Sequence, residues 1–575
     1  MTDTTLSGPP AMAAAAAPSL NRDADAAVPL WAWAAWVVTA MAVAAIVPFD
    51  ASYDVAHYHI HNGWAAWNDR IDRDFAPADM HSFLNPAYNV FAWWLIERLP
   101  GPLVNSVLVI PAALTVPALF YLARTVSTIM VGQASRATCL AVAFVGFMAE
   151  GQVGVFASIR NDAWGAAAFL GALALTLSAD GRLANWRRLV AASLLLGGVL
   201  GMKLTNLPYV IGYGVLVMLL ARSWTERLRV GAICGAAGLF SVACLFGPHA
   251  WVLWERFANP VFPVANDIFQ SPVGPTEFDT YERRRPGLLY MLVYPFAFTW
   301  DGSLIGSEHS KDLRFLLAYI SAPVLLARVW LGHRKGETPD GSRPVIALSA
   351  AILVAMVLWM QGFSVLRYLL AAWMIGPLML MAVYWAVAGK PAPDGRSLRI
   401  LGAGAIALLL LTNFNALRRA SWDNFNAPYI SAEIANPERF NNAFILFTGD
   451  YPSAFLAPLF PETATFAAAV PQDYFRPALE NYRPRLRAAL AAQPDLPIYA
   501  VMFVDDTAPP LDRTSVLAKL NAQEHLVGDP AACEDLPNNF DLSVGDWILC
   551  PVHRQSGLAL RPTLSPLWTA PPDLG

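Results

Sequence analysis

The sequence predicts a mainly α-helical protein in which about eleven transmembrane helices form a bundle and a small extracytoplasmic α/β domain follows. Three observations support this fold class. Of the 575 residues, 56% are hydrophobic and only 14% are charged, whereas about a quarter of the residues in a typical soluble domain are charged. The mean hydropathy is +0.42. Apolar runs of transmembrane length recur from residue 30 to residue 414, and a polar, proline-rich segment follows them.

The chain begins with a segment rich in alanine and proline, residues 1–28, which we expect to be disordered and cytoplasmic. The first apolar run, residues 30–49, starts late and lacks a convincing cleavage site, so we interpret it as a retained transmembrane helix rather than a signal peptide. Further apolar stretches are also predicted to span the membrane. They lie at residues 102–123, 137–156, 162–178, 189–204, 207–221, 230–254, 313–331, 345–360, 364–388 and 398–414.

Lysine and arginine gather in every second loop between these predicted helices, for example at residues 182–188 and 222–229. Cytoplasmic loops carry such an excess of positive charge, so these loops are assigned to the cytoplasm and the alternate loops to the outside. The outer parts are then residues 50–101, residues 255–312 and everything after residue 415. The small net charge of -4 gives no reason to expect a nucleic-acid partner.

This assignment divides the chain into a transmembrane domain, residues 29–415, and a periplasmic domain, residues 416–575. In the second domain, "AFILFTG" and "PIYAVMFV" resemble strands and "PRLRAALAAQ" resembles a helix, so we predict a small α/β fold. Cys533 and Cys550 are its only cysteines. An oxidising compartment would favour a disulfide between them, and two free thiols are the alternative.

An unusual polar stretch, "YDVAHYHIHNGWAAWNDR", directly follows the first predicted helix. His57, His59 and His61 alternate in it, and on a strand three imidazoles would face one side and bind zinc or copper. The surrounding sequence fits a helix better, and on a helix this spacing points the rings in different directions. Such a helix would lie on the membrane surface, anchored by its tryptophans and with the histidines facing headgroups.

A surface helix does not explain Asp54, which lies in the same stretch. A carboxylate near the lipid boundary costs free energy unless it is paired or used in chemistry. Tyr58 and His59 follow it closely. Asp54 would therefore suit a general base that takes a proton from an acceptor hydroxyl.

These features resemble the GT-C superfamily, the integral-membrane glycosyltransferases that use polyprenyl-phosphate-linked sugars and carry an essential acidic residue in the first extracytoplasmic loop. Asp54 stands at that place. The chain is more narrowly similar to bacterial GT-C-like proteins that share several short patterns over most of its length. The patterns present here are D-x-x-x-Y-H at Asp54, Tyr58 and His59, "FAPADMHSFLNP" with Asn85 and Pro86, "SIRNDAWG" with Asn161 and Asp162, "GMKLTN" with Lys203, Thr205 and Asn206, "WERFANPVFP", Arg367-Tyr368 and "FTGDYPSAFLAPLFP".

The resemblance implies a transferase of the bacterial inner membrane that moves a sugar, with inversion, from a polyprenyl-phosphate donor to an envelope glycan, lipid or protein. No cofactor is implied, and a divalent metal is not expected. The implied catalytic residues are Asp54, His59 and Asp162. Many relatives carry paired acids in the first loop, whereas Val55 follows Asp54 here, so Asp50 is a rival for the base. The implied substrate-binding residues are Tyr58, Asn85, Asn161, Lys203, Asn206, Arg284, Arg367 and Tyr368.

Most of these side chains also have a structural interpretation. Asn161 and Asp162 would cap a helix, or Asp162 would pair with its neighbour Arg160. Lys203 would reach for the membrane surface, or it would bind the donor's phosphate. Arg367 would neutralise the leaving phosphate, or it would form an ion pair with an acid such as Asp162.

The run "YERRRPG", which contains Arg284, lies on the predicted outer side against the general charge bias. It would bind the donor phosphate, a glycan or anionic lipid, or form a solvated face. For the whole protein, the rival hypotheses are a transporter or lipid flippase and a non-catalytic assembly protein for envelope polysaccharide. The sequence shows no convincing internal repeat of the kind that secondary transporters carry.

Overall fold

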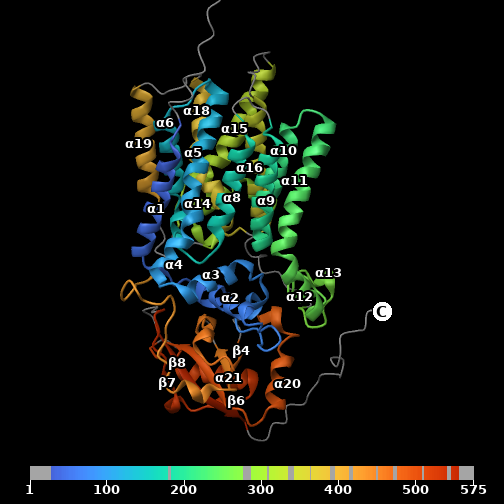
Figure 1. Ribbon diagram of the computed structural model, residues 1–575, viewed down its shortest axis with the longest axis vertical. Helices are drawn as coiled ribbons and strands as arrows, with labels where there is room; N and C mark the ends of the chain where they lie inside the picture. The colour runs from blue at the N-terminus through green and yellow to red at the C-terminus, as the bar shows by residue number, and fades with distance from the viewer. Residues whose placement is uncertain are drawn as a thin grey trace, which may run out of the picture.

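A bundle of apolar helices forms one end of the molecule, and a smaller region built on a β-sheet forms the other, as the computed structural model in Figure 1 shows. By length and composition, five helices of the described chain are long and apolar enough to cross a membrane, and shorter apolar helices lie among them. The structure describes residues 27–178, 183–275, 286–306, 310–334, 342–362, 364–388, 395–412, 419–448, 451–470, 476–507, 511–540 and 545–555.

The helices of the bundle lie within or close to the apolar runs that the sequence marks as spans. Their ends follow local sequence signals: Ser135, Asn185 and Ser223 each accept a hydrogen bond from the backbone N–H three residues later. The bundle helices are α1 (Leu30–Ile46), α5 (Ile110–Val131), α6 (Arg136–Phe147), α7 (Glu150–Gly154), α8 (Asp162–Thr176), α9 (Trp186–Met202), α10 (Leu207–Leu220), α11 (Trp224–Leu245), α15 (Arg314–Arg334), α16 (Ser342–Gly362), α17 (Leu370–Met374), α18 (Gly376–Ala388) and α19 (Gly395–Leu411).

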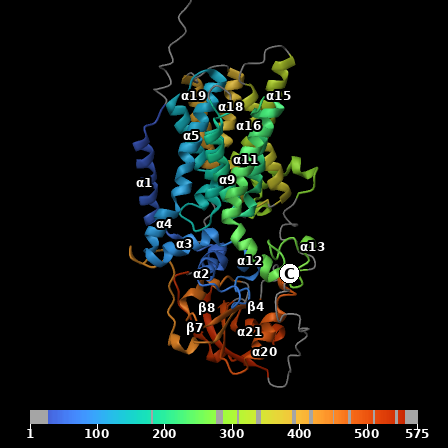
Figure 2. The same ribbon diagram turned by 45° about the vertical axis from the view of Figure 1, so that its right-hand side comes forward.

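Short helices from the predicted outer loops, and two from the ends of the apolar runs 102–123 and 230–254, lie where the bundle meets the sheet region, which we call the junction (Figures 1 and 2). Residues 50–101 and the first part of 255–312 therefore lie at the same end of the bundle as the C-terminal region, as the charge pattern predicts. The later helix α14 (Tyr294–Trp300) instead packs on the bundle, where the Phe298 ring contacts the rings of Phe315 and Trp359. The junction helices are α2 (Ile60–Trp67), α3 (Ala87–Arg98), α4 (Gly101–Leu108), α12 (Gly247–Phe257) and α13 (Asn266–Phe269).

The histidine-rich stretch forms a π-helical turn, η2 (Val55–His59), and then α2, so the helical interpretation is confirmed. Its predicted place on the membrane surface is wrong for most of its residues. The three alternating histidines are 2–4% exposed, and Trp64 is 3% exposed because its ring packs edge-on against Phe466 of the C-terminal region. Only Trp67, 48% exposed, is free to act as an interfacial anchor. The histidines therefore face protein rather than headgroups.

The C-terminal region contains a six-stranded mixed sheet within the described residues, in the order β4-β3-β5-β8-β6, with β7 paired to β8. Strand β3 is parallel to β4 and β5, and β8 is antiparallel to β5, β6 and β7. The strands predicted at "AFILFTG" and "PIYAVMFV" and the predicted helix are present as β3, β5 and α20. The bounds are β3 (Phe444–Thr448), β4 (Thr465–Val470), β5 (Ile498–Val504), β6 (Leu526–Gly528), β7 (Glu534–Asp535), β8 (Asp546–Arg554), α20 (Pro484–Ala492) and α21 (Arg513–Glu524).

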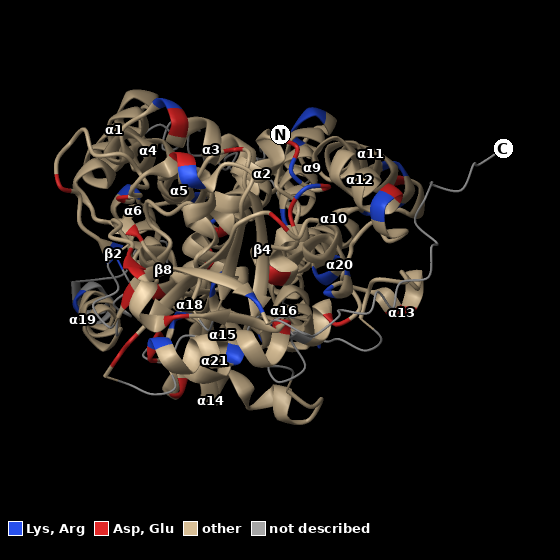
Figure 3. Cartoon of the chain, turned by 90° about the horizontal axis from the view of Figure 1, so that it is seen from below, with Lys and Arg blue, Asp and Glu red and all other residues tan. Residues whose placement is uncertain are grey.

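A disulfide joins Cys533 to Cys550 in β8, which confirms the predicted pairing. The predicted domain boundary at residue 415 lies outside the described residues. Seen from the sheet end, basic and acidic residues are interspersed over the elements rather than gathered by sign (Figure 3).

The first loop is bonded to the C-terminal region at two places. Strand β1 (Phe49–Asp50) pairs antiparallel with β2 (Arg419–Ala420). The backbone N–H of Phe75 donates to the carbonyl oxygen of Phe466, so residue 75 pairs with the edge of β4. Next to it, the Arg70 guanidinium donates to two carbonyl oxygens of the segment that leads into β4. These contacts hold the loop against the sheet.

The buried pair of Arg70 and Asp74 gives a stability prediction. Their side chains are 3% and 5% exposed, and Arg70 Nε lies 2.6 Å from Asp74 Oδ2. Arg70→Met removes the cation and leaves a buried carboxylate, so the free energy of unfolding of the detergent-solubilised chain should fall by about 3–5 kcal/mol.

Arg256→Met is the matched control, because Arg256 pairs with Asp72 while both side chains are about half exposed. Its effect should stay below about 1 kcal/mol. Equal stability of the Arg70 variant and the wild type in denaturant titrations would contradict the structural role of the buried pair.

Candidate functional site

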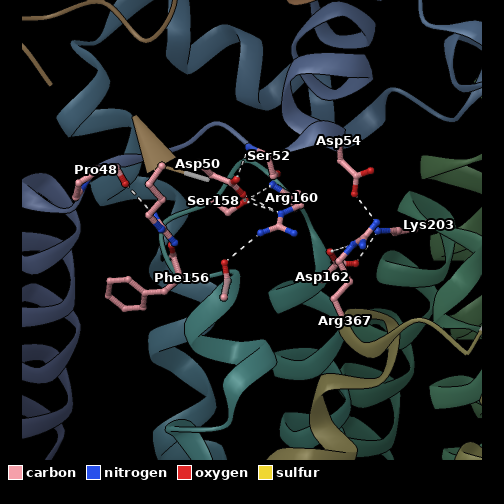
Figure 4. A network of polar contacts seen from close by, with 12 residues as sticks. Pro48, Asp50, Ser52, Asp54, Phe156, Ser158, Arg160, Asp162, Lys203 and Arg367 are labelled. Carbon is pink, nitrogen blue, oxygen red and sulfur yellow. Dashed lines mark hydrogen bonds and ion pairs between the residues drawn. The ribbon is translucent and has the colours of Figure 1, made fainter. Parts of the chain in front are cut away.

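Four ionisable side chains from distant parts of the sequence meet at the junction (Figure 4). Asp54 directly precedes η2, and Asp162 is the first residue of α8. Lys203 ends α9 as its C-cap residue, and Arg367 lies in the 3-10 turn η8 (Leu366–Leu369). Helix ends and a turn supply all four, so their positions are fixed by the packing of four separate segments.

The four side chains form a continuous series of ion pairs that alternate in charge. Lys203 Nζ donates to Asp162 Oδ1 at 2.6 Å, and Arg367 Nε lies 3.3 Å from Asp162 Oδ2. Arg367 Nη2 in turn donates to Asp54 Oδ2. The order is therefore Lys203, Asp162, Arg367 and Asp54, which we call the charge cluster. Its two cations and two carboxylates together carry no net charge.

Three of the four side chains of the charge cluster are partly exposed. The side chains of Asp54, Arg367 and Lys203 are 16%, 21% and 15% exposed, whereas Asp162 is 2% exposed. A ligand would therefore have access to both cations and Asp54 but hardly to Asp162.

Tyr368 places one aromatic ring beside both cations. Lys203 Nζ lies 4.5 Å and Arg367 Cζ 4.9 Å from the centre of its ring. Cations are attracted to the negative face of an aromatic ring at such distances. Tyr368 therefore helps to keep the ammonium and the guanidinium close together despite their like charges.

The Asp54 carboxylate is held in its charged form. Burial alone would raise its pKa, but the nearby positive charges, of which Arg367 is the strongest, outweigh burial, and the pKa is lowered from its usual value. In this arrangement Asp54 is a weak base. It gains basicity only if Arg367 is drawn away from it.

His59 is a neutral imidazole with one unused nitrogen. Burial, followed by the charge of Lys203, lowers its pKa to about 4. Its Nδ1 lies 2.9 Å from Asn89 Oδ1, and because an amide oxygen only accepts, Nδ1 carries the hydrogen. Nε2 then has a lone pair and no hydrogen-bond partner within the described residues. Gly63 makes this contact possible, because a Cβ there would lie 2.3 Å from the Asn89 carbonyl oxygen.

Tyr58 lies next to the cluster as a buried phenol. Its ring stacks on His81 at a centroid distance of 5.0 Å and an angle of 12°. Burial and then the charge of Asp54 raise its pKa well above the usual value, so the hydroxyl keeps its proton and acts as a donor.

Asp50, the rival for the base, has a structural role. It is fully buried and accepts hydrogen bonds from Arg160 Nε at 2.9 Å, from Ser158 Oγ at 2.5 Å and from the backbone N–H of Ser52. Burial would raise its pKa, but Arg160 outweighs burial and lowers it. The hypothesis that Arg160 pairs with its neighbour Asp162 is wrong, because Arg160 pairs with Asp50 (Figure 4).

Asn161 occupies the N-cap position of α8 but makes no capping hydrogen bond with its side chain. The Asn161 side-chain oxygen is buried and has no hydrogen-bond partner in the part of the chain that is described. The capping interpretation therefore explains neither Asn161 nor Asp162, whose carboxylate is turned to Lys203 and Arg367.

Two predicted substrate-binding asparagines bond to backbone instead. Asn85 donates to the carbonyl oxygens of Gly201 and Leu245 and accepts from the N–H of Ala87. Asn206 donates to the carbonyl oxygen of Val199. Both asparagines therefore help to fix the end of α9, and so Lys203, and their predicted binding of substrate stays a prediction.

Arg284 and its two neighbouring arginines lie outside the described residues. Among the residues that are described, no group of three or more His, Cys, Asp or Glu side chains has an arrangement that would hold a metal ion.

No protein-family model and no curated protein matches the chain. The resemblance to GT-C glycosyltransferases therefore stays a prediction from the chain's own motifs.

Two residues of the site were not predicted. Asn89, which sets the hydrogen position on His59, lies in "AYNVFAWWLIER", and the only signal is one amide in an apolar helix. Arg160 was assigned the wrong partner because Asp50 is 110 residues away in the sequence and the local neighbour Asp162 was preferred.

The lowered pKa of Asp54 gives a pH prediction. A carboxylate with a lowered folded-state pKa stabilises the fold fully above its unfolded-state pKa of about 3.9, and this contribution declines as the pH falls further. The melting temperatures of the wild type and Asp54→Asn should therefore differ most at pH 5–7 and converge as the pH is lowered below about 4.

Asp72→Asn serves as the control, because its exposed pair with Arg256 should contribute little at any pH. A constant difference between the wild type and the Asp54 variant over the whole pH range would contradict the ionic interaction of Asp54 with Arg367.

Proposed function

We propose that this protein is a GT-C-type membrane glycosyltransferase that moves a sugar from a polyprenyl-phosphate donor to an extracytoplasmic acceptor. The observation that carries the proposal is the charge cluster, in which Lys203 and Arg367 lie side by side at the junction and remain partly exposed. Phosphate is among the anionic groups that arginine and lysine bind well.

The proposed setting is the bacterial inner membrane, with about eleven spans, a cytoplasmic N-terminus and a periplasmic C-terminal region. The apolar helices support a membrane protein. Helix α11 runs into α12 at the junction, so the basic start of α11 lies at the opposite end of the bundle. The Cys533–Cys550 disulfide suits an oxidising compartment.

In the proposed first step, the donor's phosphate binds Lys203 and Arg367 and replaces Asp54 as the partner of Arg367. The Arg367 guanidinium offers two parallel N–H donors to phosphate oxygens, and Lys203 adds a compact positive charge. Asp162 keeps both cations in place from behind, because it contacts each of them and is 2% exposed.

This exchange activates Asp54. Once Arg367 binds phosphate, the carboxylate loses its closest positive partner, and burial then raises its proton affinity. Asp54 takes the proton of the acceptor hydroxyl, whose oxygen attacks the anomeric carbon. The bond from that carbon to the phosphate oxygen breaks, and its electron pair leaves with the lipid phosphate. A single displacement of this kind inverts the anomeric carbon.

The cations stabilise the negative charge that develops on the leaving phosphate. Such electrostatic stabilisation of the transition state is usually the largest single contribution to catalysis. His59 Nε2 and the Tyr58 hydroxyl lie at the edge of the cluster as an acceptor and a donor. They are suited to orient hydroxyl groups of the sugar or the acceptor.

Asp54→Asn tests the base. Transfer of tritiated sugar from polyprenyl phosphate by membranes that contain the variant should fall by a factor of about 10²–10⁴. Asp72→Asn, at an exposed ion pair, should retain full activity. Full activity of the Asp54 variant at normal protein level would exclude the assigned role.

Lys203→Met tests phosphate binding. A hydrogen bond to a charged group contributes about 1.5–3 kcal/mol, so the KM for the lipid-linked donor should rise roughly 10- to 100-fold. The KM for the acceptor should change little, and Lys203→Arg should recover part of the loss. An unchanged donor KM would contradict a phosphate site at Lys203.

Reconstitution of the purified protein in liposomes distinguishes this proposal from its rivals, which are a transporter or flippase and a non-catalytic assembly protein. Movement of lipid or sugar across liposomes without sugar transfer would favour the carrier. Neither transfer nor movement by a folded protein would favour the assembly role.

A further inference from the structure

Exposed tryptophans mark the end of the bundle that lies away from the sheet region. Trp186 is the first residue of α9, Trp224 is the first residue of α11, and Trp330 lies near the end of α15 (Figure 2). They are 55%, 74% and 53% exposed. Each indole carries the guanidinium of a nearby arginine over its ring, at 5.6, 5.4 and 3.9 Å from the ring centre. Exposed indoles beside cations at a bundle end are typical of a membrane–water interface.

A second group of exposed aromatic residues lies at the junction, on α2 and α3. Phe91, Trp94 and Arg98 follow one another on α3 at spacings of three and four residues, which places them on one face of the helix. Phe91 and Trp94 are 39% and 41% exposed, and Trp67 at the end of α2 is 48% exposed. Arg98 Cζ lies 5.1 Å from the ring centre of Trp94 and 5.8 Å from that of Trp67. We call these four residues the α3 surface.

Helices α12 and α13 carry similar residues at another side of the junction (Figures 1 and 3). Trp251 and Trp254, three residues apart on α12, are 63% and 46% exposed. Ile268 of α13 is 72% exposed, and Val264 before it is 46% exposed. The ring of Phe269 contacts the ring of Trp254 at a centroid distance of 6.5 Å, so α13 lies beside α12. We call the four exposed residues the α12–α13 surface.

Helix α11 connects the two ends of the bundle. It begins at Trp224, and after its last residue the chain continues into α12, which carries Trp251. Its 22 residues extend over about 33 Å, and the hydrocarbon core of a bilayer is about 30 Å thick. Only 6% of its apolar window is buried, and Leu239 and Phe240 in its second half are 71% and 65% exposed. Exposed tryptophans therefore flank an exposed apolar helix whose length matches the hydrocarbon core.

A lipid bilayer is the partner that fits this apolar surface. Large exposed apolar side chains lie on opposite sides of the bundle (Figure 1). Val38 on α1 and Leu410 on α19 are 63% and 80% exposed on one side, and Leu239 on α11 is exposed on the other. A single protein partner would cover one of these sides, whereas a bilayer surrounds the bundle and covers both. In water, an apolar surface of this extent would cost free energy.

We propose that the outer boundary of the bilayer lies along the junction, with the α3 surface and the α12–α13 surface inserted in the layer of lipid headgroups. The tryptophans at the starts of α9 and α11 then lie in the headgroup layer of the opposite leaflet. Arg98 keeps its aliphatic stem beside the indole rings, and its 45% exposed side chain places the guanidinium among the lipid phosphates.

This placement puts the charge cluster at the depth of the headgroups, because the cluster lies at the same junction. A phosphate carried by a lipid then reaches Lys203 and Arg367 while its tail stays in the hydrocarbon layer. This consequence for a lipid-linked donor rests on the proposed function. The position of the bilayer does not, because it follows from the exposed residues and the length of α11.

Spin-label depth measurements on the full chain in phosphatidylglycerol–phosphatidylethanolamine nanodiscs test the placement. In a background in which the three free cysteines are replaced by alanine, a nitroxide is attached at Phe91→Cys, in the α3 surface, or at Ile268→Cys, in the α12–α13 surface. Power-saturation EPR compares collisions with oxygen, which concentrates in the hydrocarbon, and with a water-soluble nickel chelate. Leu239→Cys is the control for the hydrocarbon core, and Ala491→Cys, at an exposed position of α20, is the control for water.

The oxygen-to-nickel collision ratio of both junction labels should lie between those of the two controls, at the value that a headgroup-labelled lipid gives in the same nanodiscs. A ratio at either junction label equal to that of the Ala491 control would show that this surface lies in water and would overturn the inference. A ratio equal to that of the Leu239 control would place the boundary beyond the junction and would overturn it as well.

The same samples separate this inference from the proposed function. Junction labels at headgroup depth in a folded protein that transfers no sugar would keep the position of the bilayer and reject the proposed function. Sugar transfer by a protein whose junction labels behave as the water control would do the reverse.

Discussion

Charge neutralisation where an apolar helix bundle meets a water-facing region is the constraint on which this structure depends. A lone charged side chain in such a place is costly, and the cost is lowered only by a partner of opposite sign. Lys203, Asp162, Arg367 and Asp54 satisfy one another in series. Because each belongs to a different segment, the same contacts that neutralise the charges also fix the first loop against α8, α9 and η8.

Two carboxylates four residues apart differ in burial, and this separates the structural role of Asp50 from the functional role proposed for Asp54. Asp50 is fully buried, and its bonds to Arg160, Ser158 and the N–H of Ser52 leave it no access to a ligand. Asp54 keeps a partly exposed side chain, and Arg367, its ion-pair partner, is exposed as well. An incoming anion therefore competes for Arg367 but has no route to Arg160, which is 6% exposed.

The sequence was sufficient for features that depend on local pattern. Apolar runs located the bundle helices, strand-like and helix-like composition located β3, β5 and α20, and the two C-terminal cysteines predicted their disulfide. The alternation of basic loops also placed Asp54 and Lys203 at one end of the bundle. Long-range packing could not be predicted from the sequence. The histidine-rich helix is buried because Phe466, about 400 residues later, covers Trp64, and no local sequence pattern indicates that contact.

The central claim is that the donor's phosphate displaces Asp54 from Arg367. A cryo-electron microscopy structure of the full chain with a non-hydrolysable polyprenyl-phosphate sugar analogue tests it most directly. The account predicts phosphate oxygens within hydrogen-bond distance of Lys203 and Arg367, with the Asp54–Arg367 bond broken. A bound analogue whose phosphate lies elsewhere, with all the ion pairs of the charge cluster intact, would contradict it.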